Sequence, residues 1–203
     1  MHSNDLKTLP PNPERATLEG KNKFMGFWLF LGGETVLFAT LFGTFLGLRN
    51  QTAGGPTSQE IFHLDLVAIM TVLLLTSSLT SVFATIAMKN NQFMKMQVWL
   101  GITVILGLAF LGMEIYEFVV YVSEYGLGFT TSAFASSFYA LVGFHGAHVL
   151  FGILWIITLM LQATKKGLTV TTAPKFYVAG LYWHFVDVVW IFIFTVVYLM
   201  GVV

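Results

Sequence analysis

The sequence predicts an all-α integral membrane protein, a bundle of five transmembrane helices. Only 10% of its 203 residues are charged, 56% are hydrophobic, and the mean hydropathy is +0.78. Soluble domains carry about 25% charged residues, which keep their surface in water. A chain this poor in charge cannot cover such a surface, whereas lipid requires no charged coat.

Five apolar stretches justify the number of helices. Each is longer than the roughly 20 residues that an α-helix needs to cross about 30 Å of hydrocarbon. Pro, Gly, Asn and Ser fill the connections between them, which favours helix–loop–helix segments over strands. A polar arm, residues 1–23, precedes a membrane domain of residues 24–203. The expected spans are residues 24–48, 64–88, 96–122, 134–162 and 176–202.

The basic residues predict the orientation in the membrane. Of the 10 Lys and Arg residues, all but Arg49 fall on the side that holds the N-terminus. Because cytoplasmic loops are enriched in basic residues, we expect a cytoplasmic N-terminus and, after five spans, a C-terminus outside. Trp28, Trp99 and Trp183 are expected to anchor the helices at the membrane surface.

The composition also excludes several classes of function. The formal net charge is zero, with 10 basic and 10 acidic residues, so the chain has no electrostatic footprint for nucleic acid. The chain contains no cysteine, which removes disulfides, thiolate metal ligands and cysteine nucleophiles together.

Seven ionisable side chains are expected at membrane depth, where each needs a partner or a function. Glu34 follows Gly32 and Gly33 in the first span. The other six form three pairs with a spacing of three residues, which places both members of a pair on one helix face. These pairs are Glu114 and Glu117 in the third span, His145 and His148 in the fourth, and His184 and Asp187 in the fifth.

Two interpretations of the pairs stay open. Carboxylates and imidazoles on separate helices could hold a metal or a haem, but di-iron bundles use Glu-x-x-His pairs, whereas these are Glu-x-x-Glu and His-x-x-His. Alternatively, the side chains pair with each other across helices and form a polar seam in an apolar bundle. We expect the second arrangement, with His148, His184 and Asp187 bracing the fourth span against the fifth or the third.

Glu34 is a separate case. With no cation expected beside it, its depth in the membrane favours the neutral carboxyl group. The flanking glycines leave room for a neighbouring helix or a lipid chain. We expect Glu34 to stay protonated near neutral pH and to be reached from the lipid side. Whether it acts in helix contact or in proton transfer stays open.

Several of these segments resemble one known family. GFHGAHVLFG (143–152) and YWHFVDVVWIFIF (182–194) are similar to the paired motifs in the last two helices of cytochrome c oxidase subunit III. SAFASSFYALV, EIYEF and GFWLFLGGETVLF are similar to the family in the same order, so the resemblance runs from about residue 20 to the end. The chain is most similar to the five-helix form of Gram-positive caa3-type oxidases, which lacks the first two of the family's seven helices.

The resemblance implies a non-catalytic subunit of a proton-pumping terminal oxidase in the bacterial plasma membrane, acting in aerobic electron transport. Such a subunit packs against subunit I, in a complex with subunits II and IV, binds phospholipid and supports proton uptake. Haem and copper are expected in the partner subunits, and no metal or catalytic residue in this chain. Glu34 matches the family's intramembrane carboxylate, and His145, His148, His184 and Asp187 match its polar seam.

Three other functions stay open. The first is subunit III of a menaquinol oxidase, which differs in the electron donor and in the copper ligands of a partner subunit. The second is a small proton-coupled transporter that uses Glu34 and Glu117, although no internal repeat or broken helix is visible. The third is a b-type haem protein that uses the histidines.

Overall fold

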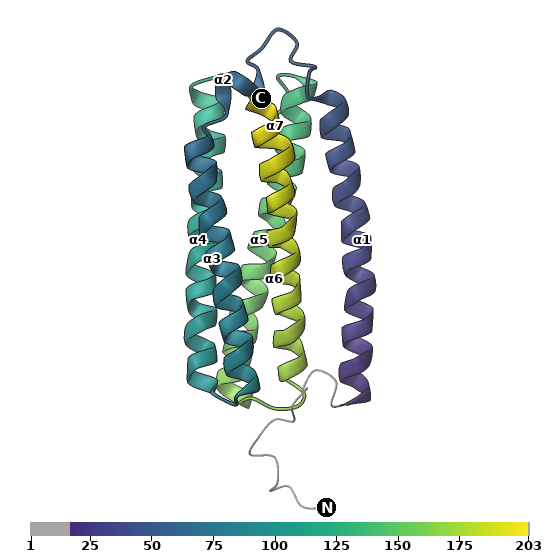
Figure 1. Ribbon diagram of the computed structural model, residues 1–203, viewed down its shortest axis with the longest axis vertical. Helices are drawn as coiled ribbons and strands as arrows, with labels where there is room; N and C mark the ends of the chain where they lie inside the picture. Colours follow the sequence, from purple (N-terminus) through teal and green to yellow (C-terminus); the bar gives the residue numbers. More distant parts are fainter. Residues whose placement is uncertain (1–16, 203) are drawn as a thin grey trace, which may run out of the picture.

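A computed structural model describes residues 17–202, and Figure 1 shows an elongated bundle of nearly parallel helices. Five helices in this range are long and apolar enough to cross a membrane, and the range contains no strand, which confirms the predicted fold class. They are α1 (Leu18–Leu48), α3 (Leu64–Lys89), α4 (Phe93–Ser123), α5 (Ala133–Lys166) and α6 (Ala173–Ile193). A π-helical turn, η2 (Phe194–Leu199), extends α6 into α7 (Met200–Val202), and the short α2 (Ser58–Ile61) lies in the first loop.

The helix ends follow local capping chemistry. α1 begins before the predicted residue 24, because the Thr17 hydroxyl accepts a hydrogen bond from the Gly20 amide (3.0 Å) and caps the helix. The predicted polar arm, residues 1–23, therefore ends in helix, and its residues 1–16 lie outside the described part of the chain, as does residue 203. Gly167 ends α5 with a φ of 70°, a conformation that glycine adopts readily.

The connections define two ends of the bundle. The α2 end contains α2, α7 and the loop between α4 and α5, at the top of Figure 1. The opposite end, the Thr17 end, contains the start of α1, the α3–α4 turn and the α5–α6 loop. All lysines of the described residues belong to the Thr17 end, and Arg49 belongs to the α2 end.

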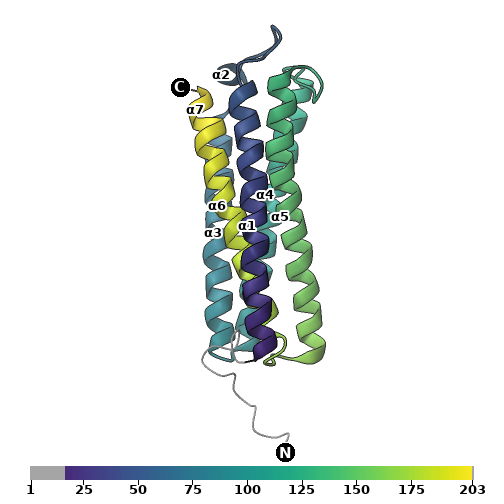
Figure 2. The same ribbon diagram turned by 90° about the vertical axis from the view of Figure 1, so that its right-hand side faces the viewer.

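α1 is the least buried of the long helices. Of 18 residues in its apolar stretch, 17% are buried, against 33% or more in the corresponding stretch of each of the others. It packs mainly on α5 and α6. Figure 1 shows it at the edge of the bundle, and Figure 2, viewed from that edge, shows it in front of the other helices. Leu31, Phe38 and Phe45 recur every seven residues and form its buried face.

Trp183 connects four helices at the centre of the bundle. Its indole lies between Gly107 of α4 and Gly152 of α5, where a Cβ would fall 2.8 Å and 3.1 Å from ring carbons. The ring nitrogen donates a hydrogen bond to Ser77 Oγ of α3 at 3.0 Å. The expectation that Trp183 anchors the membrane surface is wrong, since only 2% of it is exposed. The two glycines leave space for the ring, and the serine satisfies its nitrogen without water.

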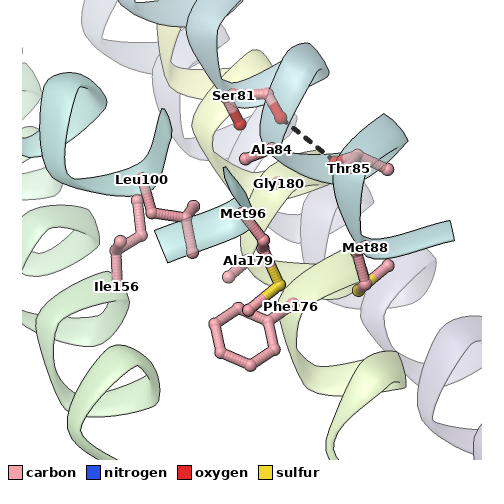
Figure 3. Close-up of a pocket in the computed structure, with 10 residues that line it drawn as sticks. All are labelled: Ser81, Ala84, Thr85, Met88, Met96, Leu100, Ile156, Phe176, Ala179 and Gly180. Atoms are coloured by element: carbon pink, nitrogen blue, oxygen red, sulfur yellow. Dashed lines mark hydrogen bonds between the residues drawn. The ribbon is translucent and has the colours of Figure 1, made fainter. Parts of the chain in front are cut away.

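A small cavity lies where α3, α4, α5 and α6 approach one another (Figure 3). Its walls include Met88, Met96 and Phe176, and its volume is about 10 Å³. The Thr85 hydroxyl beside it donates to the Ser81 carbonyl within α3, as the dashed line in Figure 3 shows. One water molecule needs roughly 10–15 Å³. The cavity is therefore a packing space between flexible methionines rather than a ligand site.

Candidate functional site

The seven predicted polar residues do not form one seam. Within residues 17–202, a side-chain hydrogen bond joins only one pair of them, Glu34 and His148. The others bond to hydroxyl groups or backbone carbonyls, or have no partner in that range. The spacing of three residues does place each pair on one helix face, but it does not determine which neighbouring helix that face meets.

Glu34 of α1 and His148 of α5 join two helices at the edge of the bundle. His148 Nε2 lies 3.0 Å from Glu34 Oε2, and the two side chains are 15% and 17% exposed. His148 Nδ1 lies 2.8 Å from the carbonyl oxygen of Phe144, which can only accept, so Nδ1 carries a proton. Nε2 and Oε2 therefore share one further proton. With the proton on Oε2 the pair is a neutral acid and a neutral imidazole, and with the proton on Nε2 it is an ion pair.

Two expectations about this pair are wrong. Glu34 does have a basic partner, because the His148 ring reaches it across the helix contact. The His148 side chain braces α5 against α1, whereas the sequence predicts a brace against α6 or α4; its backbone carbonyl accepts a hydrogen bond from Tyr182 of α6 (3.1 Å). Gly32 and Gly33 open onto free space, since a Cβ on either would meet nothing within 4 Å. The glycines therefore leave the surface beside the pair open instead of admitting a helix of this chain.

Ser78 of α3 joins His184 and Asp187 of α6. Its Oγ lies 2.7 Å from His184 Nδ1, and the Asp187 carboxyl group interacts with the same hydroxyl. Asp187 is 5% exposed, and its Oδ1 has no hydrogen-bond partner among the described residues. This brace connects the second and fifth spans, whereas the sequence predicts one between the fourth span and its neighbours.

His145 lies in the apolar core. It is 0% exposed, and its ring lies 5.2 Å from the ring of Trp190 and 5.7 Å from that of Phe110. Its Nε2 lies 3.2 Å from the Val186 carbonyl oxygen of α6, so Nε2 carries the proton of the neutral ring and donates it. The other nitrogen, Nδ1, has no partner in the described part of the chain. The ring thus braces α5 against the backbone of α6.

Glu114 and Glu117 lie on the inner face of α4. Glu117 is 1% exposed and accepts hydrogen bonds from Tyr121 (2.7 Å, at Oε1) and from Tyr198 of η2 (2.9 Å, at Oε2). Glu114 is 3% exposed, and neither of its carboxyl oxygens has a partner within residues 17–202. Our sequence interpretation missed both tyrosines, although the Glu-x-x-x-Tyr spacing places Tyr121 on the same helix face as Glu117.

Our sequence interpretation also missed the hydroxyl groups that join α3 to its neighbours. Thr80 and Thr103 share a hydrogen bond of 2.8 Å between α3 and α4. The Trp190 indole of α6 donates to Thr71 of α3 at 3.0 Å. Serines and threonines that recur every three or four residues in an apolar helix are a signal for such contacts, because lipid offers their hydroxyls no partner.

No three His, Asp, Glu or Cys side chains of residues 17–202 converge in a way that could hold a metal ion. The three buried or half-buried histidines instead meet a carboxyl group, a hydroxyl and a backbone carbonyl. That haem and copper reside in partner subunits stays a prediction.

The fold and these contacts define a class of protein: a multi-pass membrane protein whose polar interior groups connect helices and can share protons. The sequence model for cytochrome c oxidase subunit III matches residues 15–202. The chain is 72% identical to the cytochrome c oxidase subunit 3 of Alkalihalophilus pseudofirmus, over 97% of this chain and 95% of the relative. It is 66% identical to the cytochrome c oxidase subunit 3 of Bacillus subtilis, again over 97% and 95%. It is 52% identical to the quinol oxidase subunit 3 of Bacillus subtilis, over 90% and 89%.

The chain belongs to the cytochrome c oxidase subunit III family. It is therefore a multi-pass protein of the bacterial plasma membrane that acts together with other oxidase subunits. The resemblance seen in the helix motifs is confirmed, including the likeness to the form found in Gram-positive bacteria.

Proposed function

We propose that this chain is the third subunit of a cytochrome c oxidase of the aa3 or caa3 type. The observation that carries this is its identity to two proteins of one organism, 66% with the cytochrome c oxidase subunit and 52% with the quinol oxidase subunit. The chain packs directly on subunit I, in a complex with subunits II and IV, and binds phospholipid. It stabilises subunit I and supports its proton uptake, while haem and copper belong to the partners.

The proposed orientation places the Thr17 end in the cytoplasm. The lysines of the described residues gather at that end, and Arg49 lies at the other. Basic residues are retained on the cytoplasmic side when membrane helices insert. The α2 end then faces outward.

Purification through an affinity tag on this chain, in mild detergent, tests the proposal. We expect subunits I, II and IV to co-purify, with haem absorption bands, a dinuclear copper signal and oxidation of reduced cytochrome c. Oxidation of menaquinol without that copper signal would favour the menaquinol oxidase. A chain that purifies alone would contradict both: haem of its own would indicate a b-type protein, and its absence would favour the transporter.

A cleft at the Thr17 end supports phospholipid binding. It has a volume of about 460 Å³ and lies between α1, α5 and α6. Phe27, Phe30 and Trp155 form apolar walls, and Lys23 and Lys175 line the same cleft. An acyl chain fits the aromatic walls. Lys23 forms an ion pair with Glu19, and Lys175 donates to the neutral side chain of Gln162, so the two lysines together leave a net positive charge that attracts a phosphate.

The cleft can be tested with paired charge variants. Lys23→Gln combined with Lys175→Gln should lower the amount of anionic phospholipid that native mass spectrometry detects on the complex. Lys165→Gln combined with Lys166→Gln is the matched control, since it removes the same charge from the same end but changes no residue of the cleft. Equal lipid loss in both double variants would indicate general surface attraction instead of a site.

A further inference from the structure

A pocket of about 250 Å³ opens at the α2 end, between the start of α3 and the last turns of α4. His63, Asp65 and Glu124 line it at the helix ends, and Glu117 and Tyr121 line it further along α4. No lysine or arginine of the described residues lies in its walls. An acidic pocket of this kind attracts cations, protons included, from the water at the membrane surface.

Glu117 connects this pocket to the dry interior. Its Oε1 accepts from Tyr121, which also lines the pocket, and its Oε2 accepts from Tyr198, which is 0% exposed. No cation of residues 17–202 forms an ion pair with it. Two phenol hydroxyls from different helices are thus the groups that stabilise a charge on this carboxyl group.

The backbone of the last span departs from regular α-helix where it meets Glu117. α6 continues into the π-helical turn η2, and Tyr198 belongs to that turn. Single π-helical turns recur at functional sites, because they redirect side chains that a regular helix would place elsewhere. Here the turn contributes the second donor to Glu117.

Glu114 is a second, independent observation in favour of proton binding in this part of the bundle. It lies three residues before Glu117 on the same face of α4, and both of its oxygens lack a partner among the described residues. It is confined by α5, because a Cβ on Gly146 would lie 2.8 Å from its carboxyl carbon. Two adjacent buried carboxylates, one of them without a hydrogen bond, are strongly disfavoured. The pair therefore needs at least one proton, which has to reach it from water.

We propose that Glu114 and Glu117 form a proton-exchange site that is supplied through the pocket at the α2 end. An arriving proton binds Glu117 Oε1, the oxygen whose hydroxyl partner lines the pocket. The Tyr121 hydroxyl then turns to donate into the pocket and accepts the hydrogen bond of the new acid group. Tyr198, which is enclosed, continues to donate to Oε2. On release, the proton returns to water in the pocket and Tyr121 donates to Oε1 again.

Titratable groups face this site from every element packed around it. All except one histidine are carboxylic acids or phenols. They are His63 and Asp65 at the start of α3, Glu114, Tyr116, Tyr121 and Glu124 of α4, Tyr125 after α4, Tyr139 of α5 and Tyr198 of η2. The site is distinct from the Glu34–His148 pair, which joins α1 to α5, and it goes beyond the proposed function.

The test uses the complete oxidase complex in sealed vesicles with one orientation. Infrared spectroscopy follows the band of protonated carboxyl groups while the pH is changed on one side only. Two variants assign the band of Glu117: Glu117→Gln should remove it, and Glu117→Asp should shift it to another frequency. We expect Glu117 to follow the pH at the α2 end, and to respond roughly tenfold or more slowly to the other side, since a charge would have to cross the hydrocarbon.

The absence of cysteine from the chain allows the pocket to be plugged. Val120→Cys places a thiol in the pocket wall, and its modification by a charged, membrane-impermeant reagent should slow the response of Glu117 roughly tenfold. Val119→Cys is the matched control, because Val119 is 58% exposed at the same depth but does not line the pocket. Leu66→Cys, on the α3 wall, provides a second plug if Val120→Cys impairs assembly.

The outcomes separate clearly. The proposal holds if Glu117 follows the α2 side and only the pocket plugs slow it. It is overturned if Glu117 follows the Thr17 side first, if no band of Glu117 responds on either side, or if the modified Val119→Cys variant slows the response as much as the plugs do.

Discussion

Gly107 is the position where one added methyl group should disturb the bundle most directly. A Cβ there would lie 2.8 Å from Cη2 of Trp183 and 3.1 Å from Cδ1 of Ile153. Carbon atoms in contact lie about 3.5–4.0 Å apart, so the indole would have to move by about 0.7 Å or more. The indole nitrogen of Trp183 donates a hydrogen bond to Ser77 (3.0 Å), and Gly152 approaches the same ring from α5. Any movement therefore breaks a hydrogen bond or creates a second close contact.

Gly107→Ala has two opposing effects on stability. Alanine favours the helix over glycine by roughly 0.5–1 kcal/mol. Extra volume in a well-packed interior costs about 1–3 kcal/mol, and a lost cross-helix hydrogen bond adds about 0.6 kcal/mol. We expect the variant to destabilise the folded bundle by about 0.6–3 kcal/mol.

Gly112→Ala is the matched control on the same helix, because a Cβ there meets nothing within 4 Å. This variant has the higher helix propensity of alanine but makes no close contact, so it should be neutral or slightly stabilising. Denaturant titration in mixed micelles, followed by tryptophan fluorescence, compares the two variants. Equal stability of Gly107→Ala and Gly112→Ala would refute the conclusion that Trp183 is confined between two glycines.

Four further predictions concern the polar groups. In a double-mutant cycle of Glu34→Gln and His148→Gln, we expect a coupling free energy of about 0.6–2 kcal/mol for the thermal stability of the subunit, and a coupling near zero would contradict the pair. A hydrophobic carbodiimide should modify Glu34, and peptide mapping that finds Glu34 unmodified but Glu114 or Glu117 modified would show that the wrong carboxyl group was assigned to the lipid surface. Asp187→Ala should reduce retention of the subunit in the complex while initial turnover stays near normal; loss of turnover with the subunit fully bound would instead require a direct role in proton transfer. The isolated chain should be colourless and metal-free by absorption spectroscopy and elemental analysis, which stoichiometric iron or copper would disprove.

The helices could be predicted from the sequence because hydrocarbon imposes a minimum length on each span. The start of α1 is harder to predict, since the capping contact between Thr17 and Gly20 lies in a polar segment whose composition predicts an arm outside the membrane instead of a helix. The departure from regular helix at η2 has no comparable sequence signal. It is visible only in the structure, where the turn contains Tyr198 and Tyr198 donates to Glu117.

The partners of the polar residues could not be predicted in the same way. His145 and His148 share a helix face, yet one bonds to α6 and the other to α1, because α5 packs against both of these helices. Trp183 resembles a surface aromatic in the sequence, since hydropathy does not distinguish an indole at a helix end from one between two glycines. Chemical type could be read from the residues, whereas pairing depends on the arrangement of helices.

α6 and α1 are held in the bundle in different ways. α6 donates indole hydrogen bonds to Ser77 and Thr71 of α3, and its extension η2 bonds to Glu117 of α4. Bonds of this kind contribute about 0.6 kcal/mol each, so the loss of one leaves the others in place. α1 depends on aromatic packing and on the contact between Glu34 and His148. A change in how that pair shares its proton therefore acts on the helix with the weakest attachment. The proposed lipid cleft lies between α1, α5 and α6, so an acyl chain bound there would contact the same two helices that the Glu34–His148 pair joins.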